Sequence, residues 1–269
     1  MLTLKANKPI GIFDSGIGGL TVTRAVIDQL PNESIVYFGD TAHLPYGDKS
    51  IQTVQNYTKK IVDFLLMREV KLILIACNAA SSAAYEMLKN YVGNRAILLN
   101  VIDPVVNFLG TNYANKRIGL IGTKLTLQTQ VYHQKIAKLA QQIDFCALAT
   151  PLLVPIIEEG FFEHELIDVA LAEYLAHPTL QNIDALVLGC THYPVIKKSI
   201  AAFYKNKIDI VDAAKIVAKE VDVALTSHGI LSSAQPNHHF YVSDYTESFA
   251  KGTRLFFGKE IKVEAIDIF

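Results

Sequence analysis

Two cysteines at the ends of apolar segments are the residues best suited to chemistry in this sequence. Cys77 follows the run 72–76 and Cys190 follows the run 185–189, and a small polar residue comes after each. Where such runs are strands of an open α/β sheet, their carboxyl ends form the edge at which ligands bind. A helix that begins beside each cysteine is expected to favour the thiolate and to lower the pKa of the thiol.

Two thiols that face one another suit a reaction that inverts a carbon centre. Taking a proton from one face and returning one to the other needs a base and an acid on opposite sides, and a thiolate and a thiol can exchange these roles. Three alternatives stay open. Each cysteine is a core residue, or one is the nucleophile of an amidase-like hydrolase, or the chain is a two-lobe binding protein for small anions. Cys146 lacks this context and is expected in a core.

The segment 13–20 is rich in glycine and follows an apolar run. Its backbone amides at the start of a helix suit an anion, and it carries Asp14 and Ser15. It is neither a Walker A loop nor a complete GxGxxG motif, because Thr21 stands at the last glycine position. Asp14 is therefore either a turn residue or a residue that acts with the ligand.

Two further polar residues, in the second half of the chain, could take part in the chemistry. His192 lies two residues after Cys190, where it is expected to tune the thiol or to move protons. Glu158 belongs to an acidic pair after an apolar run, a candidate motif that could also be only a helix start. The cysteines have no CxxC or histidine-ligand spacing, and the histidines at 228, 238 and 239 lack it too, so no metal is expected.

Short apolar runs alternate with segments of helical period along the chain, which predicts parallel sheets covered by helices on both faces. The expected strands are 9–13, 34–38, 71–76, 96–102, 117–121, 143–147, 183–188 and 208–211. The expected helices are 20–30, 51–66, 79–91, 125–140, 166–176 and 213–225. The tail 240–268 is expected to form a strand, a helix and a strand.

Two stretches of the chain resemble one another. Residues 8–15 are similar to 116–123, and residues 72–78 are similar to 185–191. We therefore expect an α/β fold of two pseudo-symmetric, doubly wound lobes with mainly parallel sheets and the active site in the cleft between them. The first lobe is expected at 1–105 with 211–269, and the second at 106–210.

The composition is that of a folded globular protein. At roughly 150 residues per domain, 269 residues suggest about two domains. The apolar share of 51% and charged share of 19% exclude disorder, collagen and coiled coil. A net charge of −1 without a basic block gives no reason to expect a nucleic-acid partner. The odd, low number of three cysteines fits a reducing compartment, and residues 1–8 do not look like a secretion signal. No apolar run approaches the ~20 residues that a membrane-spanning helix needs. We therefore expect a cytoplasmic protein outside the membrane.

Taken together, these motifs resemble those of the glutamate racemases, in the aspartate/glutamate racemase superfamily, over almost the whole chain. The resemblance rests on the segments FDSG at 13–16, PYG with KS at 45–50, ACN at 76–78, VPIIE at 154–158 and LGCTHYP at 188–194. It implies a cofactor-independent racemase that interconverts L- and D-glutamate. Such an enzyme supplies D-glutamate for bacterial peptidoglycan, and so serves cell-wall biogenesis and cell shape. A homodimer is a family-based expectation.

The resemblance also implies roles for single residues. Cys77 and Cys190 are the two acid/base residues, the first acting on D-glutamate and the second on L-glutamate. Asp14 is the partner of Cys77, and Glu158 and His192 assist Cys190. The implied substrate-binding residues are Asp14, Ser15, Pro45, Tyr46, Gly47, Asn78, Ala79, Thr123, Thr191 and His192.

Three residues depart from the family pattern. Ala79 stands where Thr is usual, His43 where Arg is usual and Thr150 where Cys is common. The hydroxyl missing at position 79 is expected to weaken glutamate binding or to relax substrate choice. An aspartate or broader amino-acid racemase is therefore the nearest alternative, because side-chain length is read by the shape of the pocket.

Overall fold

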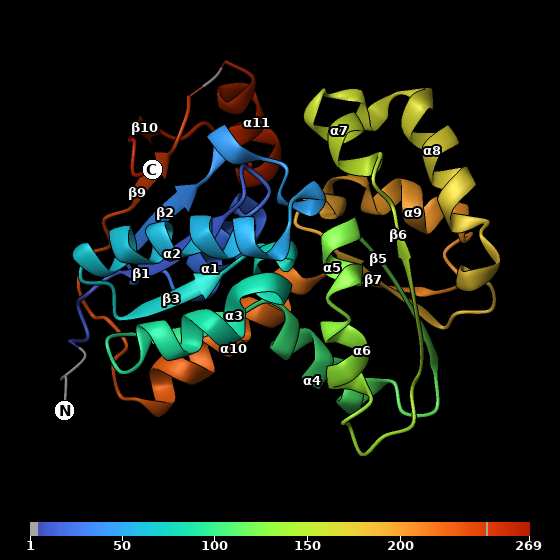
Figure 1. The fold of residues 1–269 in the computed structure, drawn as a ribbon, viewed down its shortest axis with the longest axis horizontal. Helices are drawn as coiled ribbons and strands as arrows, with labels where there is room; N and C mark the ends of the chain where they lie inside the picture. The colour runs from blue at the N-terminus through green and yellow to red at the C-terminus, as the bar shows by residue number, and fades with distance from the viewer. Residues whose placement is uncertain (1–4, 246) are drawn as a thin grey trace.

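Two parallel sheets form the framework of the protein. The computed structural model describes residues 5–245 and 247–269, so the first four residues of the predicted first lobe and Thr246 in the predicted tail lie outside the described residues. The strands are β1 (Ile10–Asp14), β2 (Ile35–Gly39), β3 (Leu72–Ile75), β4 (Ile97–Asn100), β5 (Arg117–Gly122), β6 (Asp144–Ala149), β7 (Ala185–Gly189), β8 (Asp209–Val211), β9 (His239–Val242) and β10 (Glu264–Ala265). The order is β10-β9-β2-β1-β3-β4 in the first sheet and β6-β5-β7-β8 in the second, and Figure 1 shows the two side by side.

Helices connect the strands and pack on the sheets. The α-helices are α1 (Leu20–Gln29), α2 (Ile51–Met67), α3 (Asn78–Val92), α4 (Ile102–Asn112), α5 (Lys124–Gln128), α6 (Val131–Ile136), α7 (Leu153–Glu158), α8 (Glu165–Leu175), α9 (Lys197–Phe203), α10 (Ala213–Ser227) and α11 (Glu247–Phe257). Short 3-10 helices are η1 (Thr41–His43), η2 (Tyr46–Asp48), η3 (Phe161–Glu163), η4 (Pro178–Leu180) and η5 (Tyr193–Ile196). Within the described ranges, no helix is long and apolar enough to cross a membrane.

Both faces of the first sheet are buried. In β3, Leu72 and Leu74 belong to the core that includes side chains of α1 and α10, whereas Ile73 and Ile75 pack with side chains of α2 and α3. Since neighbouring side chains of a strand point to opposite faces, helices on both faces require every residue to be apolar. This requirement explains the continuous apolar run in the sequence.

The two sheets share one strand order. The first contains β2-β1-β3-β4 and the second is β6-β5-β7-β8, so β1 corresponds to β5 and β3 to β7. These are the strands whose sequences resemble one another. The order reverses between β1 and β3 and between β5 and β7, and open α/β sheets bind ligands at such switch points. The predicted fold class is confirmed.

We propose that the lobes divide as the sequence predicts, at 1–105 with 211–269 and at 106–210. The first sheet takes its strands from residues 10–100 and 239–265, and the second from 117–211. Helix α10 follows β8 of the second sheet but packs against α1 of the first. This packing supports a crossing of the chain near residue 211.

The strand predicted at 96–102 is shorter than expected, because a helix begins inside it. Oδ1 of Asn100 accepts hydrogen bonds from the backbone N–H groups of Ile102 at 2.8 Å and Asp103 at 2.9 Å. These bonds satisfy free amides in the first turn of α4, and Pro104 fits that turn because it needs no donor there. Periodicity did not predict α4, and it did not predict α9 either.

The helix predicted at 125–140 is two short helices, α5 and α6. Gln130 separates them with a left-handed φ of 57°, which ends the α-helical path although the apolar period continues. The break turns α6 so that Tyr132 is buried against Asn78 of the first lobe. Periodicity alone carries no sign of this turn.

Candidate active site

Cys77 lies at the first switch point, between β3 and α3. It is the N-cap of α3, and its Sγ accepts a hydrogen bond from the backbone N–H of Ala80 at 3.4 Å. The same sulfur lies 3.7 Å from Oγ of Ser15, which follows β1. The side chain is buried. Two adjacent strand ends therefore fix the position of this thiol.

The pKa of Cys77 differs from the expectation based on its place at a helix N-terminus. Burial, followed by the charge of Asp14, raises the pKa of the thiol to about 12. The hydrogen bonds with Ala80 and Ser15 act in the opposite direction but do not outweigh burial. Cys77 is therefore a neutral thiol at neutral pH in this structure, able to donate a proton.

Asp14 is fully buried at the end of β1. Its Oδ2 accepts a hydrogen bond from the N–H of Gly16 at 3.1 Å, and its Oδ1 accepts one from the hydroxyl of Thr191 at 3.4 Å. Burial raises the pKa of this carboxyl, while the charge of His192 and the hydrogen bonds lower it. The bond to Thr191 joins the two lobes directly beside the thiols.

A chain of three side chains begins at Cys190, which follows β7. Nδ1 of His192 lies 3.8 Å from Sγ of Cys190, and Nε2 of His192 lies 3.0 Å from Oε1 of Glu158 at the end of α7. Cys190 and His192 are buried, and the carboxylate of Glu158 is partly exposed. The imidazole therefore bridges the thiol and a carboxylate.

His192 is an imidazolium at neutral pH in this arrangement. Burial lowers the pKa of the ring, but the hydrogen bonds to Cys190 and Glu158 and the charges of these groups prevail and raise it to about 10. The imidazole lies beside Sγ of Cys190, where it can pass a proton to or from the site. The two thiols thus have unlike surroundings, because Cys77 faces the carboxyl of Asp14 and Cys190 faces a cation.

One cavity between the lobes is lined by both thiols. The cavity is narrow in this structure, with an open volume of about 20 Å³. Every residue predicted for catalysis or substrate binding lines it except Asp14, whose side chain is buried outside its wall. Direct contact between Asp14 and the substrate therefore stays a prediction.

The loop that carries Tyr46 is fixed by a buried carboxylate. Asp40 accepts hydrogen bonds from the hydroxyl of Tyr46 at 2.5 Å, from Nδ1 of His43 at 2.8 Å and from the hydroxyl of Ser243 at 2.7 Å. The imidazole of His43 stacks on Tyr57 at 4.2 Å between ring centroids. His43, which stands where Arg is usual in the family, thus helps to hold the loop that carries Tyr46.

Sequence reasoning missed three lining residues, Leu44, Val154 and Gly189. All three stand inside or next to the quoted motifs, but an apolar side chain or a glycine there is indistinguishable from a core residue by type alone. A further contact, from the hydroxyl of Tyr132 to Asn78, joins residues that no local pattern connects. Cys146 lies on β6 and is half-buried at the edge of the core, so the expected core position is met only in part.

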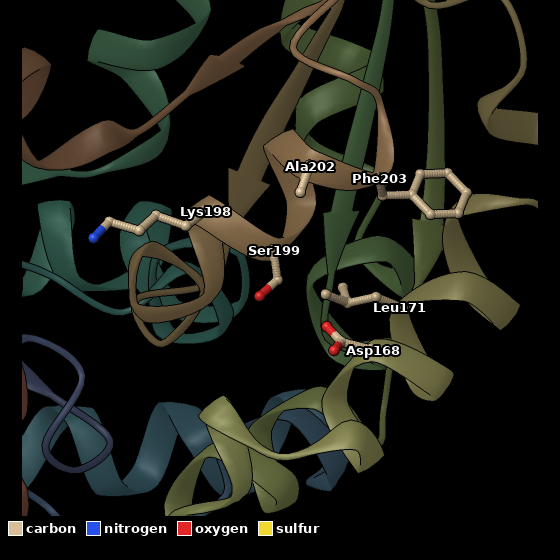
Figure 2. A pocket seen from close by; sticks show the side chains of 6 residues that line it. All are labelled: Asp168, Leu171, Lys198, Ser199, Ala202 and Phe203. Carbon is tan, nitrogen blue, oxygen red and sulfur yellow. The ribbon is translucent and has the colours of Figure 1, made fainter.

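A second hollow lies between α8 and α9, and Figure 2 shows it from close by. Its lining residues include Asp168 and Leu171 of α8 and Lys198, Ala202 and Phe203 of α9. It contains neither thiol and none of the predicted site residues. We therefore assign the chemistry to the cavity between the lobes.

Comparison with known proteins agrees with this geometry. The profile of the Asp/Glu/hydantoin racemases matches residues 10–221 of the chain. The chain belongs to this family. Membership of this racemase family makes the protein an isomerase, which agrees with two proton-transfer groups at one cavity.

Individual members of the family are similar over nearly the full chain. The glutamate racemase of Chlorobaculum parvum is 40% identical over 260 residues, which are 96% of this chain and 95% of the relative. The structure of glutamate racemase from Francisella tularensis in complex with D-glutamate is 35% identical, with a TM-score of 0.90 over 98% of each chain. Glutamate racemase from Bacillus anthracis has a TM-score of 0.91 at 31% identity, over 97% of this chain and 98% of that one. The resemblance seen in the motifs is confirmed.

Proposed function

We propose that this protein is a glutamate racemase that interconverts L- and D-glutamate by two-base proton transfer between Cys77, Cys190 and the α-carbon. The observation that carries the proposal is the single cavity lined by both thiols, one from each lobe. A substrate between them presents opposite faces of its α-carbon to the two sulfurs. Close relatives named glutamate racemase support the choice of substrate.

The surroundings of the thiols set the direction of the first proton transfer. Cys190, with His192 beside it, acts as the base that takes the α-proton of L-glutamate. Cys77, held as a thiol by burial and by Asp14, then gives its proton to the opposite face. The products are D-glutamate, a thiol at Cys190 and a thiolate at Cys77. The enzyme is then ready for the reverse reaction.

Polar groups at the cavity wall hold the carboxylates of the substrate. Ser15, Thr123 and Thr191 offer hydroxyls and Asn78 offers an amide. The backbone amides at the start of α3 add the positive end of a helix dipole. Fixed donors of this kind stabilise the negative charge that develops when the α-proton leaves, and need no reorganisation at that moment. The mechanism therefore needs no cofactor.

The biological role follows from the product. D-glutamate made in the cytoplasm supplies peptidoglycan synthesis, and so cell-wall biogenesis and cell shape, as the resemblance to glutamate racemases implies. Aspartate is the nearest alternative substrate, because Ala79 on the cavity wall lacks the hydroxyl usual in the family.

Circular dichroism tests the proposal directly. Purified protein without added cofactor is incubated with L-glutamate, D-glutamate or either enantiomer of aspartate, and the decay of optical activity is followed. We expect both glutamate enantiomers to approach the same racemic end point, and aspartate to react far more slowly. Loss of optical activity from aspartate alone would replace glutamate by aspartate, and persistent optical activity in all samples would overturn racemisation.

Single substitutions separate racemisation from hydrolysis. Cys77→Ser and Cys190→Ser are each expected to lower kcat by about 100-fold or more, because each removes one partner of the proton transfer. Cys146→Ser is the matched control, since Cys146 lies outside the cavity. A hydrolase would need only one thiol and would accumulate a covalent acyl-enzyme, which intact-protein mass spectrometry detects.

A further inference from the structure

Tyr132 reaches across the lobes to a residue of the cavity wall. It lies on α6 beside the second sheet, and its hydroxyl donates a hydrogen bond to Oδ1 of Asn78 at 2.8 Å. Asn78 is the first residue of α3 in the other lobe and lines the cavity. Tyr132 and Asn78 are 3% and 4% exposed, so water does not compete for this bond.

The bond fixes which end of the Asn78 amide is free. An amide has one acceptor end and one donor end, and the hydroxyl of Tyr132 occupies the acceptor Oδ1. Within the described residues, Nδ2 of Asn78 has no protein partner, so its two N–H donors are left for a ligand. A flipped amide would leave the buried hydroxyl hydrogen of Tyr132 without its acceptor, and it would present an oxygen to the substrate, where it would repel a carboxylate.

We propose that Tyr132 is a positioning residue of the racemase: it holds the amide of Asn78 so that Nδ2 donates to a carboxylate of glutamate. The inference rests on the proposed function and deepens it. Tyr132 does not line the cavity and acts only through Asn78. Burial raises the pKa of its hydroxyl far above the neutral range, so the hydroxyl keeps its proton and stays a donor.

The bond also couples the amide to closure of the cleft. Tyr132 belongs to the second lobe and Asn78 to the first, so the amide is held only while the lobes are together. Any opening of the cleft would break this bond and leave the amide free to turn. Binding of the carboxylate and closure of the lobes therefore favour one another.

Tyr132→Phe tests the inference, because it removes only the hydroxyl. We expect kcat/KM for both enantiomers to fall about three- to tenfold, mainly through a higher KM, since one hydrogen bond no longer selects the amide orientation. Tyr113→Phe is the matched control, because the hydroxyl of Tyr113 donates to Asp209 at 3.0 Å and neither residue lines the cavity. It is expected to keep wild-type kinetics.

A double-mutant cycle distinguishes positioning from a general structural effect. In an Asn78→Ala background, Tyr132→Phe is expected to change KM by less than about twofold, because the group it positions is gone. Additive losses would show that Tyr132 does not act through Asn78. Tyr132→Phe with wild-type KM would overturn the inference outright.

Asn78→Asp tests the orientation with Tyr132 intact. The hydroxyl then binds one carboxylate oxygen and the other faces the substrate, so affinity for D-glutamate, measured by calorimetry, is expected to fall below that of Asn78→Ala. Equal or better binding would overturn the inference.

The two proposals fail separately. A wild-type protein that does not racemise glutamate overturns the proposed function. An active wild type with unaffected variants overturns only the role of Tyr132.

Discussion

The residues nearest to the two thiols differ. Both sulfurs are buried, yet Cys77 has the carboxyl of Asp14 beside it and Cys190 has the imidazole of His192. Sequence reasoning found the thiols, Asp14, Glu158 and His192 from their motifs. It expected a lowered pKa at Cys77, because it considered the helix terminus alone and not the desolvation of a sulfur enclosed by two lobes.

The raised pKa of His192 predicts how stability depends on pH. The folded-state pKa of about 10 lies above the ordinary value of 6.5, so the stabilisation it provides is complete below pH 6.5 and is lost as pH rises through about 10. We expect the stability difference between wild type and His192→Gln to shrink by more than about 1 kcal/mol between about pH 7 and pH 10. Urea unfolding of both proteins at a series of pH values measures the difference in their free energies of unfolding. A difference that is constant or grows with pH would contradict a charged imidazole at neutral pH.

At the scale of elements, the glycine-rich segment after β1 permits the close approach of the lobes. A Cβ atom on Gly18 would lie 2.4 Å from Oγ1 of Thr191 and 2.7 Å from Nδ1 of His192. A Cβ atom on Gly16 would meet only the flexible side chain of Leu44, at 3.3 Å. Sequence reasoning attributed these glycines to anion binding, whereas at Gly18 the structure requires a glycine for contact with the other lobe.

Gly18→Ala is therefore expected to displace Thr191 and His192. We expect kcat/KM to fall about 100-fold, because small displacements of catalytic groups have effects of this size. The free energy of unfolding should fall by about 1–3 kcal/mol from overpacking. Gly16→Ala is the matched variant, with a much smaller loss in both measurements. Steady-state kinetics and urea unfolding of the pair provide the test, and similar behaviour of the two variants would rule out the contact as the cause.

The elements themselves were predicted well where burial makes the pattern simple. A strand covered on both faces, such as β3, appears in the sequence as a continuous apolar run, and the predicted strand 71–76 contains it. Two of the missed features depend on single residues that redirect the backbone, namely Asn100 at the start of α4 and Gln130 between α5 and α6. An apolar period records which face is buried, but not where the chain turns between two buried segments.

At the scale of the whole molecule, a buried ion pair ties separate segments of the first lobe together. Nζ of Lys71 lies 2.6 Å from Oε2 of Glu33 and also donates to the carbonyls of Ala6 and Ile230. Oε1 of Glu33 accepts a hydrogen bond from the N–H of Ser232 at 2.7 Å. The pair thus joins the start of β3 to the segment that returns from the second lobe, a contact between distant residues that no sequence pattern predicts.

Lys71→Met is expected to destabilise the fold and leave catalysis intact. It leaves the buried carboxylate of Glu33 without a cation, which costs about 3–5 kcal/mol of unfolding free energy. The double variant Lys71→Met/Glu33→Gln should recover part of this loss, and both should keep kcat at low temperature because neither residue lines the cavity. Urea unfolding decides the matter, since a loss below about 1 kcal/mol would show that the pair does not hold the lobe.

The central claim is that the two thiols act on opposite faces of one carbon, and the isotope at that carbon tests it most directly. Protein equilibrated in deuterated water, so that exchangeable thiols carry deuterium, is given L-glutamate, and both enantiomers are separated early in the reaction and analysed by mass spectrometry. We predict deuterium at the α-carbon of nearly all D-glutamate formed and protium in the L-glutamate recovered. Transfer of the original protium to the D-glutamate would show that a single group carries the proton between faces, and would contradict the two-base account.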